Sequence, residues 1–429
     1  MERIKLVLIC SFSNSKVRKH LPLDSRKLYG FVRKILHLPA KTNSYGDVAG
    51  WDTYMIELLR KRNDVDLYVI SAHSGLKSTK VAFELEGVHY YFIKSDFATF
   101  LKHVIPSPKL WHSLNPMRPV VAKILKGINP NIIALIGAEN SHISGTIVGI
   151  KNVPIIVKCQ TIYNNPNRKA NGFFDEKNAY VERLIFKEAK YVSTDFGIYE
   201  QLFRVYNKTA YNFIWSFGNI LPEVNIVKKE YDFVNYAMGM SPKKGFPDAI
   251  EAIAIVKKKH PEVTLNLVGG GSAEQKAELK KMADDLGVGD NVFFTPFFEK
   301  QEDLFQHIQK SKFAILPCKM DSIASTIRQA MHYGLPVICY RTDGTPSLNS
   351  EKQCVLIAEN GDVQMLAEKM LLLLEDHELV ETLKVNAKNY ASRWSDDERI
   401  SNQMMTNFMA VMDNYNKGVP VPKELLYIP

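Results

Sequence analysis

The chain has 429 residues, of which 46% are apolar and 24% charged, as in ordinary globular proteins, and this length favours two domains of about 200 residues each. The first apolar run, MERIKLVLICSF, is too short for a signal peptide or a membrane span, and no later run reaches the ~18 consecutive apolar residues of a spanning helix. We therefore expect a cytoplasmic protein. The net charge of +9 suggests an anionic partner, but not nucleic acid, because no recognition motif accompanies it.

Part of the positive charge is concentrated near the N-terminus. Between Ser13 and Ser44 there are eight Lys or Arg residues and one Asp. Within this stretch, residues 25–38 place apolar side chains near one helical face and basic side chains beside or opposite it. Such a helix can lie on an anionic membrane surface, which would make the protein peripheral to the inner face of a membrane. Alternatively, its apolar stripe packs on its own domain.

Strands and helices alternate along the chain, which indicates an α/β protein with parallel sheets. In the first half, we predict strands at 5–12, 65–72, 131–138, 153–159 and 190–194, and helices at 51–62 and 179–189. In the second half, we predict strands at 232–240, 264–271, 291–296, 313–318, 336–340 and 354–358, and helices at 246–261, 273–287 and 362–378. The five cysteines form no CxxC pair and are expected to be buried free thiols.

This pattern predicts two Rossmann-like, doubly wound domains. The predicted segments, in chain order, are a first domain (1–218), a linker (219–229), a second domain (230–395) and a C-terminal segment (396–429) that begins as a long helix. The Met and Phe side chains of this helix are spaced for burial. Because open α/β sheets bind ligands beyond the carboxyl ends of their strands, we expect the two domains to face a central cleft.

Two strand–turn–helix junctions in the second half suit a phosphate-bearing ligand. In MGMSPKKGFPDAIEA, Lys243 and Lys244 precede Gly245 and a helix N-terminus, so cations and backbone N–H groups converge. In LVGGGSAEQKAEL, the glycines at 269–271 let a ligand approach the backbone, and Ser272 can cap the next helix. A glycine turn alone is weak evidence, because any tight strand–helix junction uses one.

A third junction, LPCKMDSIASTIRQAMHYGLPVICY, adds polar groups at the same sheet edge. Asp321 lies in the loop after the strand, and Ser325 or Thr326 is the expected cap of a helix whose N-terminus favours a phosphate. Gln329 is about one turn into this helix and can reach a sugar hydroxyl. Gly334 suits a left-handed position at the helix end.

Together these motifs resemble the C-terminal domain of retaining GT-B glycosyltransferases of family 4, the glycosyl transferases group 1, of the bacterial surface-polysaccharide type. The similarity covers residues 230 to about 390, with SPKKG, LVGGGSAEQKAEL, NVFFTPF, the third junction, DGTPSL and ENGDVQMLAEKM in order. The first half is similar more loosely, through YGDVAGWDTYMIELL and INPNIIALIGAENSHISG. The resemblance implies that the second domain binds a sugar nucleotide, that the first binds the acceptor, and that the final helix packs back on the first.

The resemblance also implies roles for single residues. In the family, a first carboxylate orients the donor sugar, a second holds the ribose hydroxyls, and an Arg and a Lys neutralise the departing diphosphate. The implied donor-binding residues are Gly239, Lys244, Gly270, Gly271, Asp321, Ser325, Thr326, Gln329, Gly344 and Thr345, of which Lys244 and Asp321 are also catalytic.

Three of these positions depart from the family. Asp321 replaces a Glu, and its side chain is shorter by about 1.5 Å. Gln329 replaces a second Glu, and this change loses about 1 kcal/mol of charge-assisted binding. Gly239 replaces the Arg, and losing one donor to a developing charge typically costs about 3 kcal/mol, roughly a hundredfold in rate. The candidates for compensation are Lys243, Lys319, Arg328 and Arg341.

Acceptor-binding candidates lie in the first half. Gly50, with Gly46, flanks the turn before a helix, where backbone can approach an acceptor. Glu139 and His142 follow the strand at 131–138, and His142 is a candidate catalytic group that orients or deprotonates an acceptor hydroxyl. Tight turns and a structural histidine are the alternatives. The basic loop at 160–174 suits an acceptor sugar or lipid phosphate.

The predicted activity is transfer of a sugar from a nucleotide diphosphate sugar to a glycan or lipid-linked acceptor, with retention and without cofactor or metal. Asp64 and Asp66 resemble a metal-binding DxD motif but lie at the wrong end of a strand, and no His/Cys cluster has metal-ligand spacing. One alternative is a non-catalytic subunit that binds a partner enzyme or a glycan, which Gly239 and Gln329 favour. Another is a sugar-nucleotide epimerase, whose acid and base carboxylates the sequence does not place.

Overall fold

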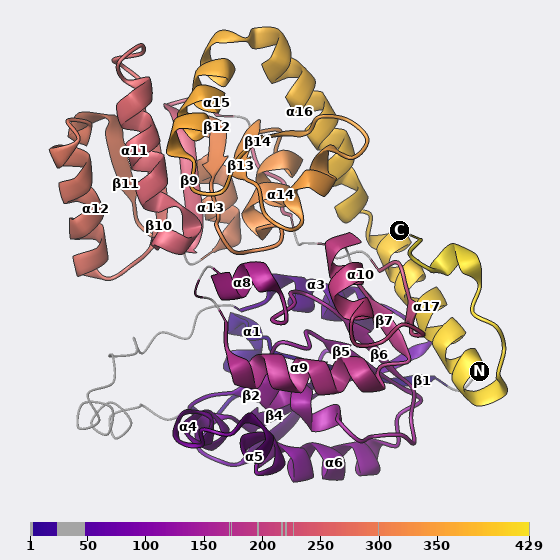
Figure 1. Ribbon diagram of the computed structural model, residues 1–429. Helices are drawn as coiled ribbons and strands as arrows, with labels where there is room; N and C mark the ends of the chain where they lie inside the picture. Colours follow the sequence, from indigo (N-terminus) through magenta and orange to yellow (C-terminus); the bar gives the residue numbers. More distant parts are fainter. Residues whose placement is uncertain are drawn as a thin grey trace. The chain divides into compact units, whose positions relative to one another are not determined.

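The chain forms two compact units, each built on one sheet flanked by helices (Figure 1). The computed structural model describes residues 3–23, 48–170, 172, 174–194, 197–215, 218, 221–225, 227–298 and 300–428. Unit 1 comprises Met1–Ile220 and Asp396–Pro429, and unit 2 comprises Leu221–Ser395. The predicted basic helix at 25–38 and Gly46 lie outside the described residues.

Unit 1 contains an eight-stranded sheet with the order β3-β4-β2-β1-β5-β6-β7-β8. All neighbouring strands are parallel except β3 and β4. Its strands are β1 (Ile4–Cys10), β2 (Val65–His73), β3 (Lys80–Leu85), β4 (Val88–Lys94), β5 (Ile132–Ile136), β6 (Ile155–Lys158), β7 (Tyr191–Ser193) and β8 (Tyr211–Asn212). The central strand β5 is buried throughout and its neighbour β1 is buried from Leu6 onward, which explains why their sequences are continuous apolar runs.

The β3–β4 hairpin was not among the predicted elements. Its turn residues, Glu86 and Gly87, have φ angles of 52° and 77°, as in the tight two-residue turns that match the twist of antiparallel strands. On β3, exposed and partly buried residues alternate, as expected at a sheet edge. The hairpin therefore adds an antiparallel edge to an otherwise parallel sheet.

The helices of unit 1 cover the sheet and connect its strands (Figure 1). They are α1 (Ser15–Arg18), α3 (Gly50–Arg60), α4 (Asp96–Val104), α5 (Pro108–Ser113), α6 (Met117–Ile128), α7 (Ser141–Ser144), η1 (Gly145–Ile147), α8 (Pro166–Ala170), α9 (Glu176–Glu188), α10 (Gly197–Arg204), α17 (Asp397–Lys417) and η6 (Lys423–Leu425).

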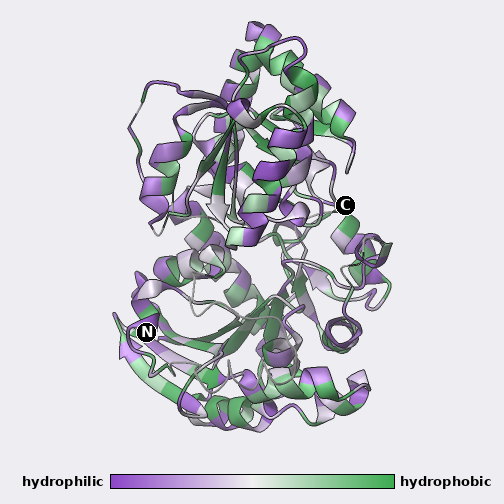
Figure 2. Cartoon of the chain, turned by 90° about the vertical axis from the view of Figure 1, so that its left-hand side faces the viewer, coloured by the Kyte–Doolittle hydropathy of each residue, from purple (hydrophilic) through white to green (hydrophobic). Residues whose placement is uncertain are grey.

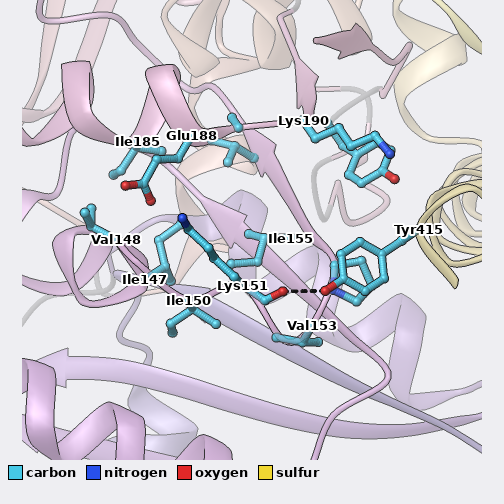
Figure 3. Close-up of a pocket in the computed structure, with 14 residues that line it drawn as sticks. Ile147, Val148, Ile150, Lys151, Val153, Ile155, Ile185, Glu188, Lys190 and Tyr415 are labelled. Atoms are coloured by element: carbon cyan, nitrogen blue, oxygen red, sulfur yellow. Dashed lines mark hydrogen bonds between the residues drawn. The ribbon is translucent and has the colours of Figure 1, made fainter.

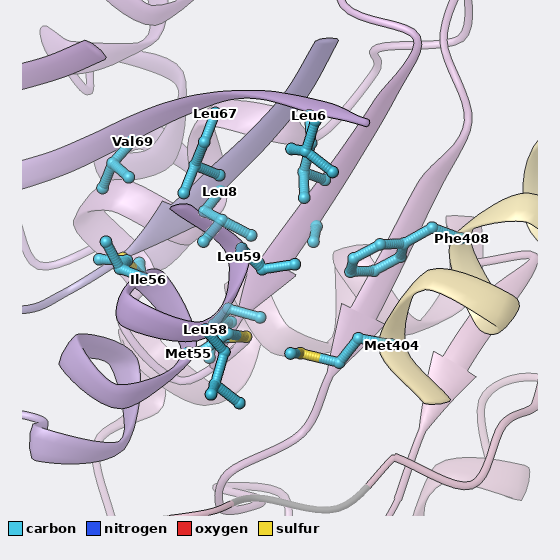
Figure 4. Packing of buried hydrophobic residues seen from close by; sticks show 14 of the residues in the cluster. Leu6, Leu8, Met55, Ile56, Leu58, Leu59, Leu67, Val69, Met404 and Phe408 are labelled. Atoms are coloured by element: carbon cyan, nitrogen blue, oxygen red, sulfur yellow. The ribbon is translucent and has the colours of Figure 1, made fainter. Parts of the chain in front are cut away.

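The C-terminal helix α17 packs into the core of unit 1, although more than 150 residues of unit 2 precede it in the chain. Figure 4 shows Met404 and Phe408 of α17 beside leucines of α3 and β1. Phe408 is fully buried and meets the Trp215 ring edge to face at 5.3 Å. The prediction that the Met and Phe side chains of this helix are spaced for burial is confirmed for all of them except Met409, which is exposed.

Unit 2 contains a six-stranded, fully parallel sheet with the order β11-β10-β9-β12-β13-β14. Its strands are β9 (Tyr231–Gly239), β10 (Leu265–Gly270), β11 (Val292–Thr295), β12 (Ser311–Leu316), β13 (Val337–Tyr340) and β14 (Val355–Ala358). Its helices are η2 (Pro242–Lys244), α11 (Phe246–Val256), α12 (Ala273–Asp285), η3 (Gly289–Asn291), α13 (Gln301–Ile308), α14 (Ser325–His332), η4 (Thr345–Asn349), α15 (Val363–Glu375), α16 (His377–Ala391) and η5 (Ser392–Trp394).

Both sheets are hydrophobic along their strands, whereas the helices have a hydrophobic and a hydrophilic side (Figure 2). In unit 2, separate clusters of buried residues fill the two faces of the sheet. The five cysteines are free and buried, as predicted. This arrangement confirms the predicted fold class of two Rossmann-like domains.

Replacing Phe408 by Ala is expected to destabilise unit 1 by about 3–5 kcal/mol, because a buried aromatic side chain leaves a cavity. Met409, the next residue along α17, is 45% exposed, so Met409→Ala is the matched control and should change stability little. Urea denaturation followed by circular dichroism measures both. Equal effects of the two substitutions would contradict the packing of α17.

Candidate functional site

The carboxyl ends of β9, β12 and β13 lie at one edge of the unit 2 sheet, because these strands are parallel neighbours. The segments that follow these strands, including the first turns of α14, contain most of the predicted donor-binding residues. The sheet topology therefore brings together segments that are about a hundred residues apart in the sequence. This edge is the candidate donor site.

The loop after β9 packs directly on the loop after β12. Gly245 has a φ of 72°, and a Cβ at this position would lie 2.2 Å from the backbone oxygen of Pro317. The Lys319 backbone N–H also donates to the Lys243 carbonyl at 3.0 Å. Only glycine combines this conformation with so close an approach, and the result is that Lys244 faces the β12 loop.

Lys244 and Asp321, the two predicted catalytic residues of unit 2, form an ion pair. The Lys244 ammonium also lies 3.9 Å from the Cys318 sulfur. Burial alone would lower the pKa of Lys244, but the nearby Cys318 and Asp321 outweigh it and the pKa is raised. Both side chains are about one third exposed (33% and 34%). A charged lysine is thus held where an incoming phosphate can reach it.

Helix α14 begins beside this pair, but its cap differs from the predicted one. Ala324 is the N-cap and makes no side-chain cap hydrogen bond, whereas Ser325 and Thr326 are the first two helical residues. The prediction that one of them caps the helix is wrong, because the extended backbone of Ala324 already starts the helix one residue earlier. The first N–H groups of a helix have no acceptor within it, so Ser325 and Thr326 present them at the site.

Gln329 lies one turn further along α14 and is partly exposed. Among the described residues, its side chain makes no hydrogen bond, so the amide is available to a ligand. Gly334 ends the helix with a φ of 70°, as predicted.

The loop after β13 forms a rim of the site. The Gly344 N–H donates to the Ser322 carbonyl at 3.1 Å, and a Cβ on Gly344 would lie 2.7 Å from the Ser322 hydroxyl. Thr345 is 1% exposed, and its hydroxyl donates to the Tyr340 carbonyl at 3.0 Å and accepts from the Thr342 N–H at 2.9 Å. The Thr345 hydroxyl therefore shapes the loop, and its part in donor binding stays a prediction.

Ser322 was not among the predicted site residues. Its hydroxyl is buried and has no hydrogen-bond partner among the described residues, although buried polar groups are normally paired. A serine next to Asp321 could have been recognised only from its place in the loop.

The glycines at the end of β10 have a structural role. A Cβ would lie 2.5 Å from the Ala237 carbonyl at Gly269 and 2.8 Å from the Met238 carbonyl at Gly270. The pairing of β9 and β10 shifts register at this point, so the two strands approach closely. Gly271 has only ordinary contacts. Roles of Gly270 and Gly271 in donor binding remain predictions. Ser272 caps α12, as predicted.

Gly239, by contrast, has no structural need to be glycine. A Cβ built on it meets nothing within 4 Å, and its φ lies outside the left-handed region. The site therefore has room for a side chain at the position where the resembled family has Arg.

Three of the cations considered as substitutes for that Arg are engaged elsewhere. Lys319 pairs with Asp248 at 2.9 Å and Arg341 pairs with Glu359 at 2.7 Å. The Arg328 guanidinium lies over the Trp394 ring at 4.5 Å. Any compensation by these cations would require breaking those contacts.

In unit 1, a buried carboxyl lies just beyond β5. Glu139 is 9% exposed, and its Oε2 has no hydrogen-bond partner among the described residues. Gly137, with a φ of 83°, leaves the space that this carboxyl fills, because a Cβ there would lie 2.6 Å from Glu139 Oε1. Burial raises the pKa of Glu139 to about 8. The carboxyl is therefore mostly protonated at neutral pH and can donate a hydrogen bond.

A second carboxyl and an amide complete this cluster. Asp52, in the first turn of α3, is 1% exposed, and burial followed by the charge of Glu139 raises its pKa well above the usual value. Gln160 lies between the two. In one orientation of its side chain, the amide nitrogen donates to Asp52 Oδ1 at 3.3 Å. With the amide turned so that both atoms find a partner, its nitrogen donates to Glu139 Oε1 at 2.9 Å and its oxygen accepts from Trp51 Nε1 at 2.6 Å.

This cluster was only partly predicted. Asp52 and Gln160 were not identified as site residues, because they come from segments far apart in the chain and neither belongs to a recognisable motif. Gly50 begins α3 and is exposed. It lies two residues before Asp52, and its role in acceptor binding remains a prediction.

His142 lies on the short helix α7, and in the described part of the chain no hydrogen bond joins it to the Glu139 side chain. His142 as a whole is partly exposed, but its imidazole ring is surrounded by protein. This burial, followed by the charge of Lys102, lowers the pKa of His142 to about 4. A neutral imidazole at pH 7 can accept a proton from a hydroxyl. His142 therefore stays a candidate base, although the structure shows no second catalytic group beside it among the described residues.

The loop after β6 is ordered by a buried acid. Glu182 of α9 is fully buried and accepts the backbone N–H groups of Tyr163 and Asn164, both at 2.9 Å. The Arg168 guanidinium lies over the Tyr163 ring at 4.3 Å. The start of this loop is therefore fixed, and contact with an acceptor remains a prediction.

The DxD-like pair lies at the amino end of β2, as predicted. Asp64 accepts two hydrogen bonds from Arg62, both at 2.8 Å, and Asp66 accepts one from Tyr68 at 2.7 Å. In the described part of the chain, no group of three His, Cys, Asp or Glu residues is arranged to hold a metal ion.

A mostly apolar pocket of about 370 Å³ lies elsewhere in unit 1 (Figure 3). Ile155 and Tyr191, which begin β6 and β7, contribute to its lining. These are the amino ends of the strands, whereas Glu139 and Gln160 follow the carboxyl ends. The pocket is therefore separate from the candidate acceptor site.

Comparison with known proteins finds a family match within the second half of the chain. Residues 219–390 match the family Glycosyl transferases group 1. An uncharacterized glycosyltransferase of Haemophilus influenzae is 25% identical over 163 residues, which are 38% of this chain and 45% of that protein. A GDP-mannose-dependent alpha-(1-6)-phosphatidylinositol monomannoside mannosyltransferase of Mycolicibacterium smegmatis is 26% identical over 157 residues, 35% of this chain and 40% of that protein. The matched region thus spans less than half of these relatives.

Solved structures are similar over nearly the whole chain. Sucrose-phosphate synthase from Thermosynechococcus elongatus has a TM-score of 0.69 at 16% identity, covering 95% of this chain and 98% of that one. HepE of Anabaena, in complex with UDP and glucose, has a TM-score of 0.64 at 18% identity and covers 95% and 100%. The fold of the chain is therefore GT-B.

The raised pKa of Glu139 should make the stability of the protein depend on pH. Its pKa is about 8 in the folded protein and about 4.3 in an unfolded chain. The folded state therefore binds more protons between these values, and the contribution of Glu139 to stability falls as pH rises through this window. Glu139→Gln cannot ionise, so its melting temperature relative to the natural protein should rise by a few degrees between pH 5 and pH 9.

Thermal unfolding at pH 5, 7 and 9 tests this. Glu278→Gln, an exposed residue of α12, is the matched control and should show no such trend. A constant difference between Glu139→Gln and the natural protein at all three pH values would contradict the raised pKa.

Proposed function

We propose that the chain is a retaining glycosyltransferase of family 4 that transfers a hexose from a nucleotide diphosphate sugar to a glycan or lipid-linked acceptor. The observation that supports this most strongly is the Lys244–Asp321 ion pair at the carboxyl edge of the unit 2 sheet. Both residues lie within the stretch 219–390 that matches the family Glycosyl transferases group 1. The UDP and glucose bound to HepE support a nucleotide sugar as the donor.

In the proposed reaction, the donor diphosphate lies at Lys244 and at the N–H groups of Ser325 and Thr326. Lys244 donates hydrogen bonds to the phosphate oxygens, and these strengthen as the leaving group gains charge. Asp321 accepts from a hydroxyl of the donor sugar once the phosphate has taken its place beside Lys244. Gln329 accepts from one ribose hydroxyl and donates to the other.

The transfer step needs no protein nucleophile. The acceptor oxygen forms a bond to C1 of the sugar on the face from which the diphosphate leaves, the C1–O bond to the diphosphate breaks, and the departing phosphate oxygen takes the acceptor proton. The protein positions both substrates and stabilises the leaving group. No metal is required in this scheme, so assays with EDTA should retain turnover.

On the acceptor side, we propose that Glu139 and His142 bind the acceptor hydroxyl. The protonated Glu139 can donate to the acceptor oxygen through its unpartnered oxygen. The neutral His142 can orient the hydroxyl by accepting its hydrogen bond before the proton passes to the departing phosphate. A role in surface polysaccharide biosynthesis rests on the resemblance of the second domain.

A second candidate is a non-catalytic subunit that binds a glycan or a partner enzyme. Gly239 favours it, because the family's Arg is absent and three nearby cations are engaged with other groups. The two candidates differ in whether the Lys244 site binds a sugar nucleotide.

Donor binding separates the two candidates. We expect one of the UDP-, GDP- or ADP-sugars to raise the melting temperature and to bind in calorimetry. Lys244→Ala should weaken that binding about 10- to 100-fold, because a hydrogen bond to a charged group contributes about 1.5–3 kcal/mol. Lys257, at the far end of α11, provides the control Lys257→Ala. Absence of binding by every donor would favour the non-catalytic subunit.

Gly239→Arg is expected to raise the rate of transfer. The site has room for this side chain, and one added donor to the leaving diphosphate is worth up to about 3 kcal/mol, roughly a hundredfold in rate. Gly239→Met, of similar length without charge, is the control for steric effects. A Gly239→Arg enzyme no faster than Gly239→Met would show that this position does not face the diphosphate.

A further inference from the structure

Helix α4 of unit 1 exposes three large apolar side chains. Phe97, Phe100 and Val104 are 57%, 50% and 51% exposed. Their spacing of three and four residues places them on one helical face, and the rings of Phe97 and Phe100 stack at 6.4 Å. Ala98, on the other side of the helix, is fully buried. Helix α4 therefore has one apolar face exposed on the surface, while Ala98 on its other side is buried in the protein.

Helix α5 continues this surface. Leu110 and Leu114 are 50% and 53% exposed. Trp111 between them is fully buried, and its indole N–H donates to the Ala98 carbonyl at 3.4 Å. This contact joins α4 and α5 on their inner sides, and Figure 1 shows the two helices next to each other. Five large apolar residues within 97–114 are thus exposed on neighbouring helices, whereas monomeric proteins usually expose such residues singly.

The charged residues that follow Asp96 in this part of the chain are basic. No Asp or Glu occurs between Asp96 and Glu139, whereas this stretch contains five Lys or Arg residues. Lys109, Lys123 and Lys126 are exposed. The nearest acids are engaged, since Asp96 accepts from the Gly75 N–H at 2.7 Å and Asp175 pairs with Lys102 at 3.1 Å.

We propose that the outer surface of α4 and α5 docks on an anionic lipid bilayer. Aromatic and aliphatic side chains beside lysines, without carboxylates, fit the boundary between anionic headgroups and acyl chains. A partner protein surface would more often be matched by charges of both signs. No helix in the described part of the chain could span a membrane, so contact of this kind would be peripheral. This proposal does not depend on the transferase activity.

The full-length protein should sediment with vesicles of phosphatidylcholine mixed with phosphatidylglycerol, and less with phosphatidylcholine alone. The double variant Phe97→Ser/Phe100→Ser should bind the anionic vesicles at least about tenfold more weakly, because two aromatic side chains no longer insert. Lys109→Glu should also weaken binding and reduce its dependence on salt. Val205→Ser, at a residue 72% exposed outside this surface, is the matched control.

Two results would overturn the proposal. One is an absence of binding to anionic vesicles, or binding that the Phe and Lys109 variants leave unchanged, which would place any membrane contact elsewhere, such as residues 25–38. The other is a dimer in light scattering that dissociates in the Phe97→Ser/Phe100→Ser variant, which would make the surface an interface between copies. Circular dichroism checks that the variants fold. Because the experiment measures lipid binding, its result does not depend on whether the protein binds a sugar nucleotide.

Discussion

The ion pair between Lys244 and Asp321 depends on how closely two loops approach at one edge of the unit 2 sheet. Gly245 allows that approach, because it adopts a left-handed conformation and its missing Cβ leaves room for the Pro317 carbonyl. A hydrogen bond from Lys319 to Lys243 then fixes the two loops together. The lysine is partly desolvated and still accessible, a combination that makes a charge effective toward a phosphate.

A second constraint is that three neighbouring cations are held by other groups. Lys319, Arg341 and Arg328 each have a neighbour that stabilises them where they are. Gly239 leaves an open space rather than a charge. A phosphate can reach Lys244 and the N-terminus of α14 without breaking these three contacts. A glycosyltransferase with this site would stabilise its leaving diphosphate less than one that has the family's Arg at position 239.

Much of the fold could be predicted because buried parallel strands are continuous apolar runs, and each of the predicted strands is present. The β3–β4 hairpin was missed because its residues alternate around a Glu-Gly turn instead of forming such a run. In the site, Lys244 and Asp321 were predicted from motif order. Asp52 and Ser322 were not, because their burial depends on segments that only the folded chain brings together. Gln160 was not, because its contact with Asp52 also joins distant segments. The helix cap at Ala324 was missed because a backbone conformation, not a side chain, starts α14.

The most direct test of the account compares a nucleoside diphosphate with its monophosphate by calorimetry, using the base of the donor that binds. If Lys244 holds the second phosphate, the natural protein should bind the diphosphate at least about tenfold more tightly. Lys244→Ala should then lose most of this preference, because only the N–H groups of Ser325 and Thr326 remain to hold the second phosphate. An unchanged preference for the diphosphate in Lys244→Ala would contradict the assignment of Lys244 as the diphosphate-binding residue.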